Sequence, residues 1–371
     1  MVCPAINFNS NRCLLRCINY ISRVKKVHLS FFLVCFLAIQ ASAQIGGQNI
    51  YRFLNLPNSS RVLALGGSAI SQRDEDVGMA YQNPGLLNSK MDNQLSLSFS
   101  DYFAGINYGY AAYGFNAGKL GTMHAGIQYV DYGTFDRADH TGEITGTFTA
   151  GEYCLTTGIG RQIDSLFSVG LNVKAIFSNL EQYNSFGMAV DFGASYLSRS
   201  KLFEMGLVLK NVGYQFNTYT ADNRESLPLE LQFGMSARLK HLPLRFSFVG
   251  HNLQQPDISF RDASFPEQEI DPLTGDTIFN KISLANKIFR HAIFGAELNI
   301  SKALSLRVGY NYQRRQEMKV ATRLGTVGFS WGIGVKIYKF GLAYARSAYH
   351  LAGSPNQITV SARLSEFYRK N

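Results

Sequence analysis

Hydrophobic side chains occupy every second position between residues 329 and 337, where Phe329, Trp331, Ile333, Val335 and Ile337 alternate with small or polar residues. Successive side chains of a β-strand point to opposite faces, so this period of two predicts a strand with one apolar face and one polar face. Soluble strands usually have about five or six residues, whereas a tilted strand needs about ten residues to cross a bilayer. The segment therefore predicts a strand of a membrane β-barrel.

Fourteen strand-like segments follow one another from Leu95 onward. They lie near residues 94–101, 105–115, 120–131, 150–161, 166–177, 183–197, 202–212, 229–240, 243–250, 290–300, 303–313, 325–338, 339–346 and 357–364. A slip of one residue would turn Arg238 or Arg307 towards lipid, at about 2–4 kcal/mol near the midplane, so the register is well specified. We expect an all-β fold, a transmembrane antiparallel β-barrel of about 14 strands.

The connections between these segments alternate in length. Those at 116–119, 162–165, 198–201, 241–242, 301–302 and around 339 are short, and those at 132–149, 213–228, 251–289, 314–324 and 347–356 are long. Bacterial barrels have short periplasmic turns and long extracellular loops, so we expect an outer-membrane protein with both termini in the periplasm. The alternative, a secreted soluble β-sandwich, would not require strands of this length or systematic loop alternation.

Residues 1–43 form the predicted signal peptide. A basic stretch, Arg23 to Lys26, precedes a short apolar run and the small residues 41–43, which resemble a cleavage site. Removing this segment lowers the net charge from +10 to +5, because it contains five basic residues and no acidic one. The smaller charge weakens a nucleic-acid-binding interpretation, and we expect no nucleic-acid partner. Only Cys154 remains, which excludes an internal disulfide in the mature chain.

Residues 44–93 differ from the barrel segment, residues 94–371. They contain Leu-Pro, Gly-Gly and Asn-Pro turn signals and little alternation. We expect a compact plug inside the lumen, with a short helix from Ser71 to Gln82. Asp74, Glu75 and Asp76 would lie in its first turn, where carboxylates suit the helix dipole, and Pro84 would end it.

No catalytic motif is evident in the mature chain. The histidines at 124, 140, 241, 251, 291 and 350 have neither metal-ligand spacing nor a recognisable Ser and acid partner. We expect no enzyme activity, cofactor or metal, with a lipase-like barrel that draws residues from separate loops as the alternative. Asp271 to Asp276 lacks the full calcium-loop pattern and is interpreted as a polar turn. A basic loop with Arg314, Arg315, Lys319 and Arg323 is either a solvated loop or a binding site for anionic glycolipid.

Two further groups of residues are candidates for function. Lys174, Glu230, Arg238, Arg307 and Arg363 occupy polar strand positions, where they form ion pairs with one another or with the plug, or select solutes in an open pore. The longest connection, 251–289, exceeds what a connection requires, and long loops of this kind usually carry function. Its apolar residues suggest a partner-binding surface, although it could equally fold back over the barrel mouth. The candidate partner residues are Phe260, Phe265, Ile270 and Phe279.

Several motifs resemble the PorQ family of the type IX secretion system. They are Phe53-Leu54-Asn55-Leu56-Pro57-Asn58-Ser59-Ser60-Arg61, Ala64-Leu65-Gly66-Gly67, Asp74-Glu75-Asp76, Asn83-Pro84-Gly85-Leu86-Leu87-Asn88 and Ile106-Asn107-Tyr108-Gly109. Gly66-Gly67 and Asn83-Pro84 also resemble the wider group of long-chain fatty acid transporter-like barrels, which includes PorV. That group usually has alanine after Asn-Pro, and we interpret Gly85 as a tolerated small residue.

The resemblance covers essentially the whole mature chain and implies a fourteen-stranded outer-membrane barrel that is not an enzyme. PorQ-like proteins anchor the surface protein PorZ and act, through it, with PorU and PorV. This attachment complex processes secreted cargo and links it to anionic lipopolysaccharide. The Gly-Gly and Asn-Pro motifs suggest an alternative function, the transport of hydrophobic small molecules across the outer membrane.

Overall fold

The computed structural model describes residues 49–220, 223–259, 268–270, 277–279, 282–319, 325–350 and 353–368. The chain divides into two compact units, residues 1–44 and 45–371, and every described residue belongs to the second unit. The predicted signal peptide therefore lies outside the described residues.

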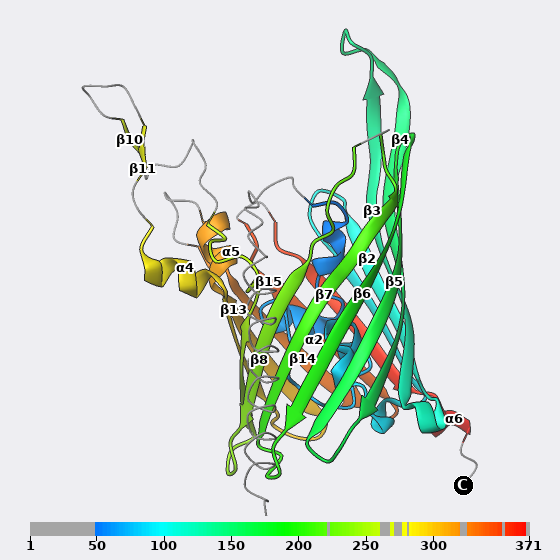
Figure 1. Ribbon diagram of the computed structural model, residues 1–371, viewed down its shortest axis with the longest axis vertical. Coiled ribbons are helices and arrows are strands. Elements are labelled where there is room, and N and C mark those ends of the chain that lie inside the picture. Colours follow the sequence, from blue (N-terminus) through cyan, green and yellow to red (C-terminus); the bar gives the residue numbers. More distant parts are fainter. Residues whose placement is uncertain are drawn as a thin grey trace, which may run out of the picture. The chain divides into compact units, whose positions relative to one another are not determined.

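Fourteen antiparallel strands close into a barrel, as Figure 1 shows, which confirms the fold predicted from the alternation. The first strand pairs with the last, so that Gln94 lies opposite Arg363 and Asp101 opposite Asn356. Closure leaves no unpaired strand edge, which a barrel in lipid requires because lipid cannot satisfy backbone polar groups. The strands are β1 (Gln94–Asp101), β2 (Asn107–Asn116), β3 (Thr122–Ala138), β4 (Ile144–Gln162), β5 (Phe167–Leu180), β6 (Tyr183–Leu197), β7 (Phe203–Asn217), β8 (Glu230–Arg238), β9 (Leu244–Gly250), β12 (Ala292–Leu298), β13 (Leu304–Asn311), β14 (Phe329–Ile337), β15 (Phe340–Ser347) and β16 (Asn356–Arg363).

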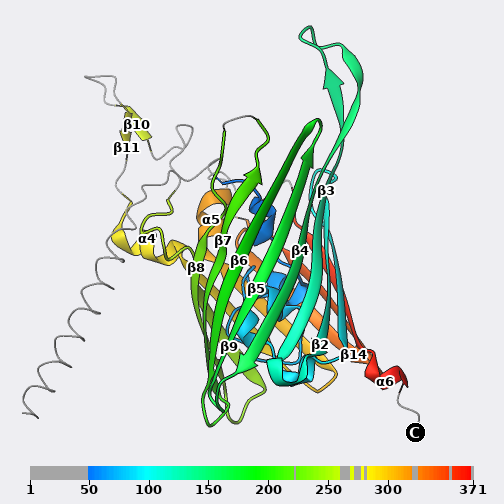
Figure 2. The ribbon, with the colours of Figure 1, turned by 45° about the vertical axis from the view of Figure 1, so that its right-hand side comes forward.

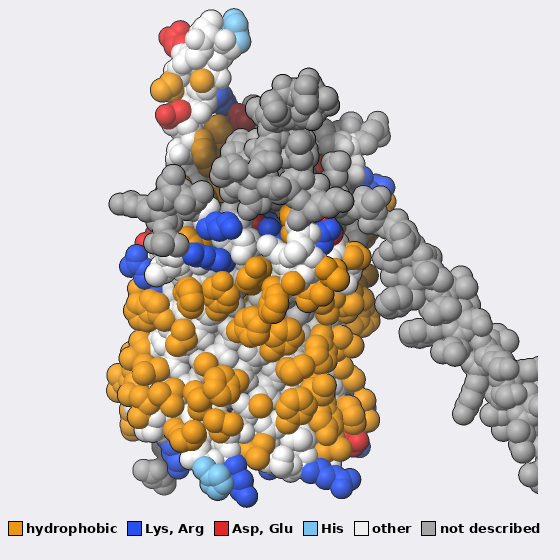
Figure 3. Space-filling view, turned by 90° about the vertical axis from the view of Figure 1, so that its left-hand side faces the viewer, with side chains coloured by type: hydrophobic (Ala, Val, Ile, Leu, Met, Phe, Trp, Pro, Cys, Tyr) orange, Lys and Arg blue, Asp and Glu red, His pale blue; other side chains and the backbone are white. Residues whose placement is uncertain are grey.

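The outer face of the barrel is a wide apolar band with charged side chains above and below it (Figure 3). Outward side chains such as Phe192, Leu207 and Trp331 are about half exposed, whereas their inward neighbours are small or polar. A lipid-facing surface with a polar interior is the arrangement that a transmembrane barrel needs. Among the described residues, no helix has the length and apolar character to cross a bilayer.

The β3–β4 hairpin extends far beyond the other strands (Figure 1). Residues 132–149 were predicted as a loop, but most of them continue the ladder, with Phe135 opposite Phe148. The alternation is lost there because most side chains of both faces are exposed, while backbone pairing persists. Hydrophobic periodicity therefore reports where lipid ends rather than where the strands end.

The two ends of the barrel differ, and are called here the long-loop end and the short-turn end. The long-loop end carries the β3–β4 hairpin, the small sheet of β10 (Gln268–Ile270) and β11 (Thr277–Phe279), α4 (Leu284–Arg290) and α5 (Tyr312–Met318), as Figure 2 also shows. The short-turn end carries η4 (Gly118–Leu120) and α6 (Ser365–Tyr368).

The chain enters the barrel from the long-loop end, where the amide of Ile50 donates to the Ser226 carbonyl at 3.1 Å. It then passes through the lumen before β1 begins at the short-turn end. The first described residues and Tyr368 therefore lie at opposite ends of the barrel, and the location of both termini in the periplasm stays a prediction. Residue 44, the expected mature N-terminus, lies outside the described residues.

Residues 49–93 fill the lumen as five short helices joined by turns: η1 (Arg52–Asn55), α2 (Ser60–Ala64), α3 (Met79–Gln82), η2 (Pro84–Leu86) and η3 (Ser89–Met91). The predicted helix from Ser71 to Gln82 is wrong in extent, because only Met79–Gln82 is helical. Asp74 and Asp76 precede that helix instead of forming its first turn. Their carboxylates are bound by arginines, and these tertiary contacts replace the expected interaction with a helix dipole.

Candidate functional site

The Gly66-Gly67 motif ends α2 and places it against the barrel wall. The amide of Gly66 donates to the Leu63 carbonyl and that of Gly67 to the Val62 carbonyl, the two bonds of a Schellman motif. Both glycines have positive φ, at 99° and 106°, a region that residues with a Cβ rarely adopt. The turn brings the Gly66 amide so near to β13 that a Cβ at Gly309 would lie 2.3 Å from it.

Asn83 joins the plug to the wall on the other side of the lumen. Its side-chain amide donates to the carbonyls of Ile70 at 2.8 Å and Ala194 at 3.1 Å, and its oxygen accepts from the Gly85 amide at 2.9 Å. Pro84 starts η2, where the missing amide hydrogen costs nothing. A Cβ at Gly85 would lie 2.9 Å from the Ala194 carbonyl carbon, so the interpretation of Gly85 as a tolerated small residue needs correction. Alanine fits there only if plug or wall shifts.

Inward-facing glycines of the barrel form the seat of the plug. At each of them an added Cβ would come within 3 Å of a plug atom, often a backbone atom. This close approach explains why small residues recur on the polar face of the strands. We call this set the glycine belt; it comprises Gly114, Gly160, Gly170, Gly187, Gly193, Gly206, Gly234, Gly309 and Gly332.

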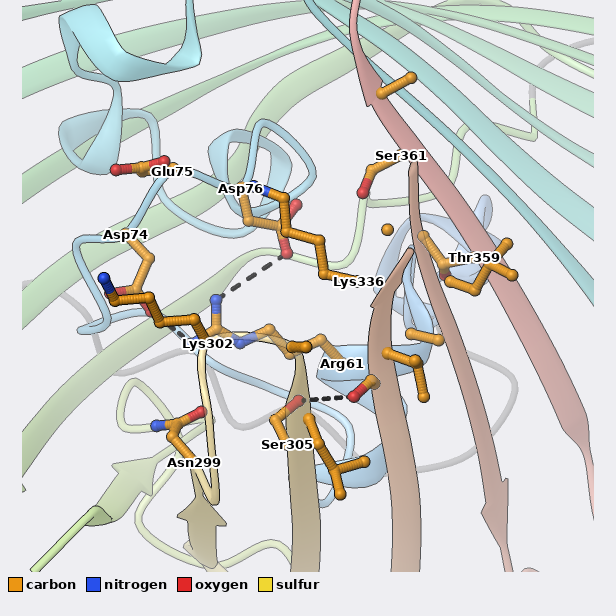
Figure 4. Close-up of a pocket in the computed structure, with 18 of the residues that line it drawn as sticks. Arg61, Asp74, Glu75, Asp76, Asn299, Lys302, Ser305, Lys336, Thr359 and Ser361 are labelled. Carbon is orange, nitrogen blue, oxygen red and sulfur yellow. Dashed lines mark hydrogen bonds and ion pairs between the residues drawn. The ribbon is translucent and has the colours of Figure 1, made fainter. Parts of the chain in front are cut away.

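An arginine and carboxylate cluster fixes the plug near the short-turn end. Asp74 of the plug accepts two bonds from Arg245 of β9, at 2.6 and 2.9 Å, and is also bound by Arg61. Arg61 in turn donates two bonds of 2.9 Å to Glu297 of β12. Figure 4 shows Arg61 and Asp74 beside a cavity into which Lys302 points. Charge-assisted bonds of this kind are stronger than neutral ones and set the geometry of the groups they join.

Three of the predicted lumen charges extend this cluster. Arg238 binds Asp74 at 2.7 Å and Glu204 at 3.1 Å, and Arg307 binds Glu297 at 2.8 Å. Arg363 contacts Glu75 of the plug at 3.2 Å, at the exposed edge of the cluster. The other aspartate of the plug motif, Asp76, accepts from the Gly78 amide at 3.0 Å and lies 3.9 Å from Arg61.

Lys174 lies apart from the cluster in a second buried pair. Its ammonium is 2.8 Å from Asp191 and 2.9 Å from the Asn211 side-chain oxygen, and both charged side chains are fully buried. The ammonium also lies 4.6 Å from the centre of the Tyr81 ring, which belongs to the plug. Glu230, the remaining predicted lumen charge, lies 3.8 Å from His251.

Five charged residues of the cluster and of the Lys174 pair were not predicted from the sequence. Four of them lie at inward-facing strand positions, the same signal that identified the predicted lumen charges. Each missed residue of the wall has the inward parity of its strand, opposite to outward neighbours such as Leu207 and Phe246. Arg61 carries no such signal, because the plug has no period. The missed residues are Arg61, Asp191, Glu204, Arg245 and Glu297.

The pKa of Asp74 gives the cluster a defined response to acid. Burial by itself raises this pKa, but the Arg61 and Arg245 guanidinium groups outweigh it and hold the pKa well below its usual range. A depressed folded-state pKa stabilises the docked plug above the unfolded-state pKa of about 3.9, and the effect is lost as pH falls through the folded-state value. We expect plug protection to persist to about pH 4 and to decline only in stronger acid. Amide exchange of residues 60–93, corrected for intrinsic rates, measures this; loss near pH 5 would contradict it.

Other predicted sites lie elsewhere. Ile270 and Phe279 belong to β10 and β11, whereas Phe260, Phe265 and residues 271–276 lie outside the described residues. The expected basic loop is helix α5 in its first part, where Arg314 donates to Ser347 and Tyr349 and Arg315 to the Gly325 carbonyl. Lys319 donates to Gln316, and Arg323 lies outside the described residues. No cluster of three or more metal-ligating side chains occurs among the residues with described positions.

Cavities lie on both sides of the plug. One of about 340 Å³ at the short-turn end is lined by Arg61, Asp74, Lys302 and Lys336, among others. Another of about 390 Å³ on the long-loop side is lined by Arg52, Lys210, Glu230 and His251. A third, of about 810 Å³, is an apolar groove with lining residues such as Val169, Phe192 and Leu207, whose side chains face outward. The cavities inside the lumen are thus polar, and the apolar one belongs to the outer wall.

The fold is similar to that of a solved toluene transporter. The toluene transporter TbuX of Ralstonia pickettii matches with a TM-score of 0.50 and 12% identity, over 83% of this chain and 99% of that chain. The toluene transporter TodX of Pseudomonas putida gives 0.48 and 11%, over 82% and 97%, and a FadL homologue of Pseudomonas aeruginosa gives 0.43 and 10%, over 82% and 98%. No protein-family model matches the sequence, and no curated protein matches it. At 12% identity the likeness to TbuX shows the fold alone.

Proposed function

We propose that this protein is a non-enzymatic outer-membrane anchor for surface proteins, with its long-loop end outside the cell. The motifs between Phe53 and Asn88 support a place in the attachment complex of the type IX secretion system. In that role the barrel would hold PorZ and, through it, PorU and PorV, beside the lipid and lipopolysaccharide of the outer membrane.

The observation that carries the proposal is the surface of α4. This helix belongs to the longest connection and lies beside the barrel at its long-loop end (Figures 1 and 2). Leu284, Ile288 and Phe289 are 73%, 61% and 49% exposed. Clustered apolar side chains outside the lipid-facing wall mark an interaction surface, since water is a poor solvent for them.

The rest of the molecule holds α4 in place. Asp257 and Lys287 form an ion pair of 2.6 Å that joins the start of the connection to its end, and Phe289 packs on Tyr312 of α5 with ring centres 5.8 Å apart. Ser283 caps the helix by accepting from the Asn286 amide. A surface fixed before binding loses less conformational entropy when the partner docks.

The packing of the plug supports an anchor rather than a channel. Ala194 and Gly309 lie on different parts of the wall, and the plug approaches the wall closely at both places. The arginine and carboxylate cluster adds charged bonds on the short-turn side. A solute could pass only if this described part of the plug moved.

The test is affinity purification of the tagged protein in mild detergent from its own cells. We expect the wild type to recover a surface protein, and Leu284→Ser with Ile288→Ser to lower that recovery by about ten-fold or more, because both apolar side chains would be lost from the contact. Leu242→Ser is the matched control, since Leu242 is 59% exposed but lies in a turn at the opposite end. Repeated recovery of the barrel alone, or equal recovery with the double variant, would count against the proposal.

A second candidate is transport of hydrophobic small molecules. The apolar groove on the outer wall favours it, because the groove lies across the wall from Asn83 and Pro84 of the plug. However, the strands beneath it, β4, β5 and β6, are paired continuously along their shared lengths. Uptake of toluene and of a long-chain fatty acid by cells lacking the protein separates the two functions; unchanged uptake excludes this candidate.

A further inference from the structure

The cavity of about 390 Å³ on the long-loop side has a composition that the proposed function does not explain. It lies between η1 of the plug, the barrel wall at β7 and β8, and α5. Its volume lies within the range of about 300–1,000 Å³ of small-molecule sites, but those sites are predominantly apolar. Charged groups line this one, namely Arg52, Lys210, Glu230, Arg314 and Glu317.

Lys210 is the central observation. Its side chain belongs to β7 and the residue is only 2% exposed, yet its ammonium makes no hydrogen bond or ion pair with the residues of known position. The nearest aromatic ring, that of Tyr81, is centred 5.8 Å away. Lys174, the other buried lysine of the wall, binds Asp191 and Asn211. A buried charge without a partner is costly, so Lys210 requires an explanation that Lys174 does not.

His251 also lines the cavity. Its Nδ1 lies 3.0 Å from the Asn252 side-chain nitrogen, and its Nε2 is buried and not accessible from the cavity. The plug contributes a second cation, the exposed Arg52.

Glu230 is the cross-strand neighbour of Lys210 and attracts its ammonium, but it makes no hydrogen bond or ion pair with it. Glu230 lies 3.8 Å from the His251 ring, beyond hydrogen-bond distance. Burial raises the pKa of Glu317, which lowers its negative charge, and Glu317 accepts from Gln313. Arg314 already binds Ser347 and Tyr349. The Lys210 ammonium is thus left without a hydrogen-bond acceptor, in a cavity lined by more cationic side chains than carboxylates.

We propose that this cavity binds a small polar molecule through an oxyanion, which the Lys210 ammonium contacts directly. Carboxylate and phosphate groups share the required chemistry, because both offer charged acceptors to an ammonium donor. The site does not depend on the anchoring function and would exist in either candidate function.

The test is calorimetric titration of the detergent-purified full-length protein at constant ionic strength. The probes are succinate, L-glutamate and inorganic phosphate, which distinguish a carboxylate ligand from a phosphate ligand. We expect at least one of them to bind, and Lys210→Gln to weaken it by about ten-fold or more, because a charge-assisted bond is lost. Lys119→Gln is the matched control, since Lys119 is exposed in η4 at the short-turn end.

Two results would overturn the proposal: no binding of any probe by the wild type, or unchanged binding by Lys210→Gln. Heat-modifiable migration on gels establishes whether each variant is folded. If Lys210→Gln does not fold, Arg52→Gln replaces it under the same criterion, because Arg52 is exposed and its loss leaves the wall intact.

Discussion

Asp74→Asn is expected to release the plug from the barrel while leaving the barrel folded. Asp74 is the shared counterion of Arg61, Arg238 and Arg245, with contacts of 2.7 Å to Arg238 and 2.6 Å to Arg245. Asparagine keeps the shape but removes the charge, which leaves the arginines with Glu204, Glu297 and the more distant Asp76. Breaking a buried ion pair from one side costs about 3–5 kcal/mol. Native-state trypsin cleavage after Arg61 or Arg73 should accelerate by on the order of 100-fold or more.

Glu75→Gln provides the control for this variant. Glu75 is the next residue, but its side chain is 52% exposed and its partners, Lys90 and Arg363, lie at the edge of the cluster. Exposed ion pairs contribute about 0–1 kcal/mol, so cleavage should change only a few-fold. If Asp74→Asn and Glu75→Gln gave the same protease sensitivity, the cluster would not be what retains the plug.

Gly309→Ala is expected to displace α2 from its seat. The added Cβ would lie 2.3 Å from the Gly66 nitrogen, 2.4 Å from the Leu65 carbonyl carbon and 2.6 Å from the Ala64 oxygen. All three are backbone atoms, so no side chain can rotate away. Overpacking costs about 1–3 kcal/mol and more when backbone must move. We expect a lower midpoint of urea unfolding and increased exchange of the α2 amides.

The matched control is Gly250→Ala in β9. There the nearest atom to an added Cβ is Leu253 Cδ2 at 3.5 Å, an ordinary contact distance, so the same chemical change meets no obstruction. Wild-type stability in Gly309→Ala, or equal destabilisation in both variants, would show that close approach of the plug is not the reason for the glycine belt.

Strand number and register could be read from the sequence because lipid imposes them at each position. A residue such as Trp331 must face outward and Gly332 inward, since the opposite register would place polar groups in the bilayer. All fourteen predicted segments correspond to strands of the barrel. The alternation of apolar and polar residues ends where the strands leave the lipid, as the β3–β4 hairpin shows.

The plug could not be derived in the same way. Residues 71–78 were predicted to be helical on local grounds, but Asp74 is bound by three arginines that come from α2, β8 and β9. These partners are 13 to 171 positions away along the chain. No local pattern encodes such contacts. Lys210 is a similar case, because its strand parity predicts that it faces inward but not that it lacks a partner.

The sequence by itself determined that this chain is a fourteen-stranded barrel with a separate N-terminal segment and alternating short and long connections. It could do so because every second side chain of a membrane-spanning strand faces lipid and must be apolar. Only the tertiary structure decided how the plug is held, which arginines share Asp74, and that Lys210 and His251 face one polar cavity. Those contacts join residues that are far apart in the chain and that come together only when the barrel forms.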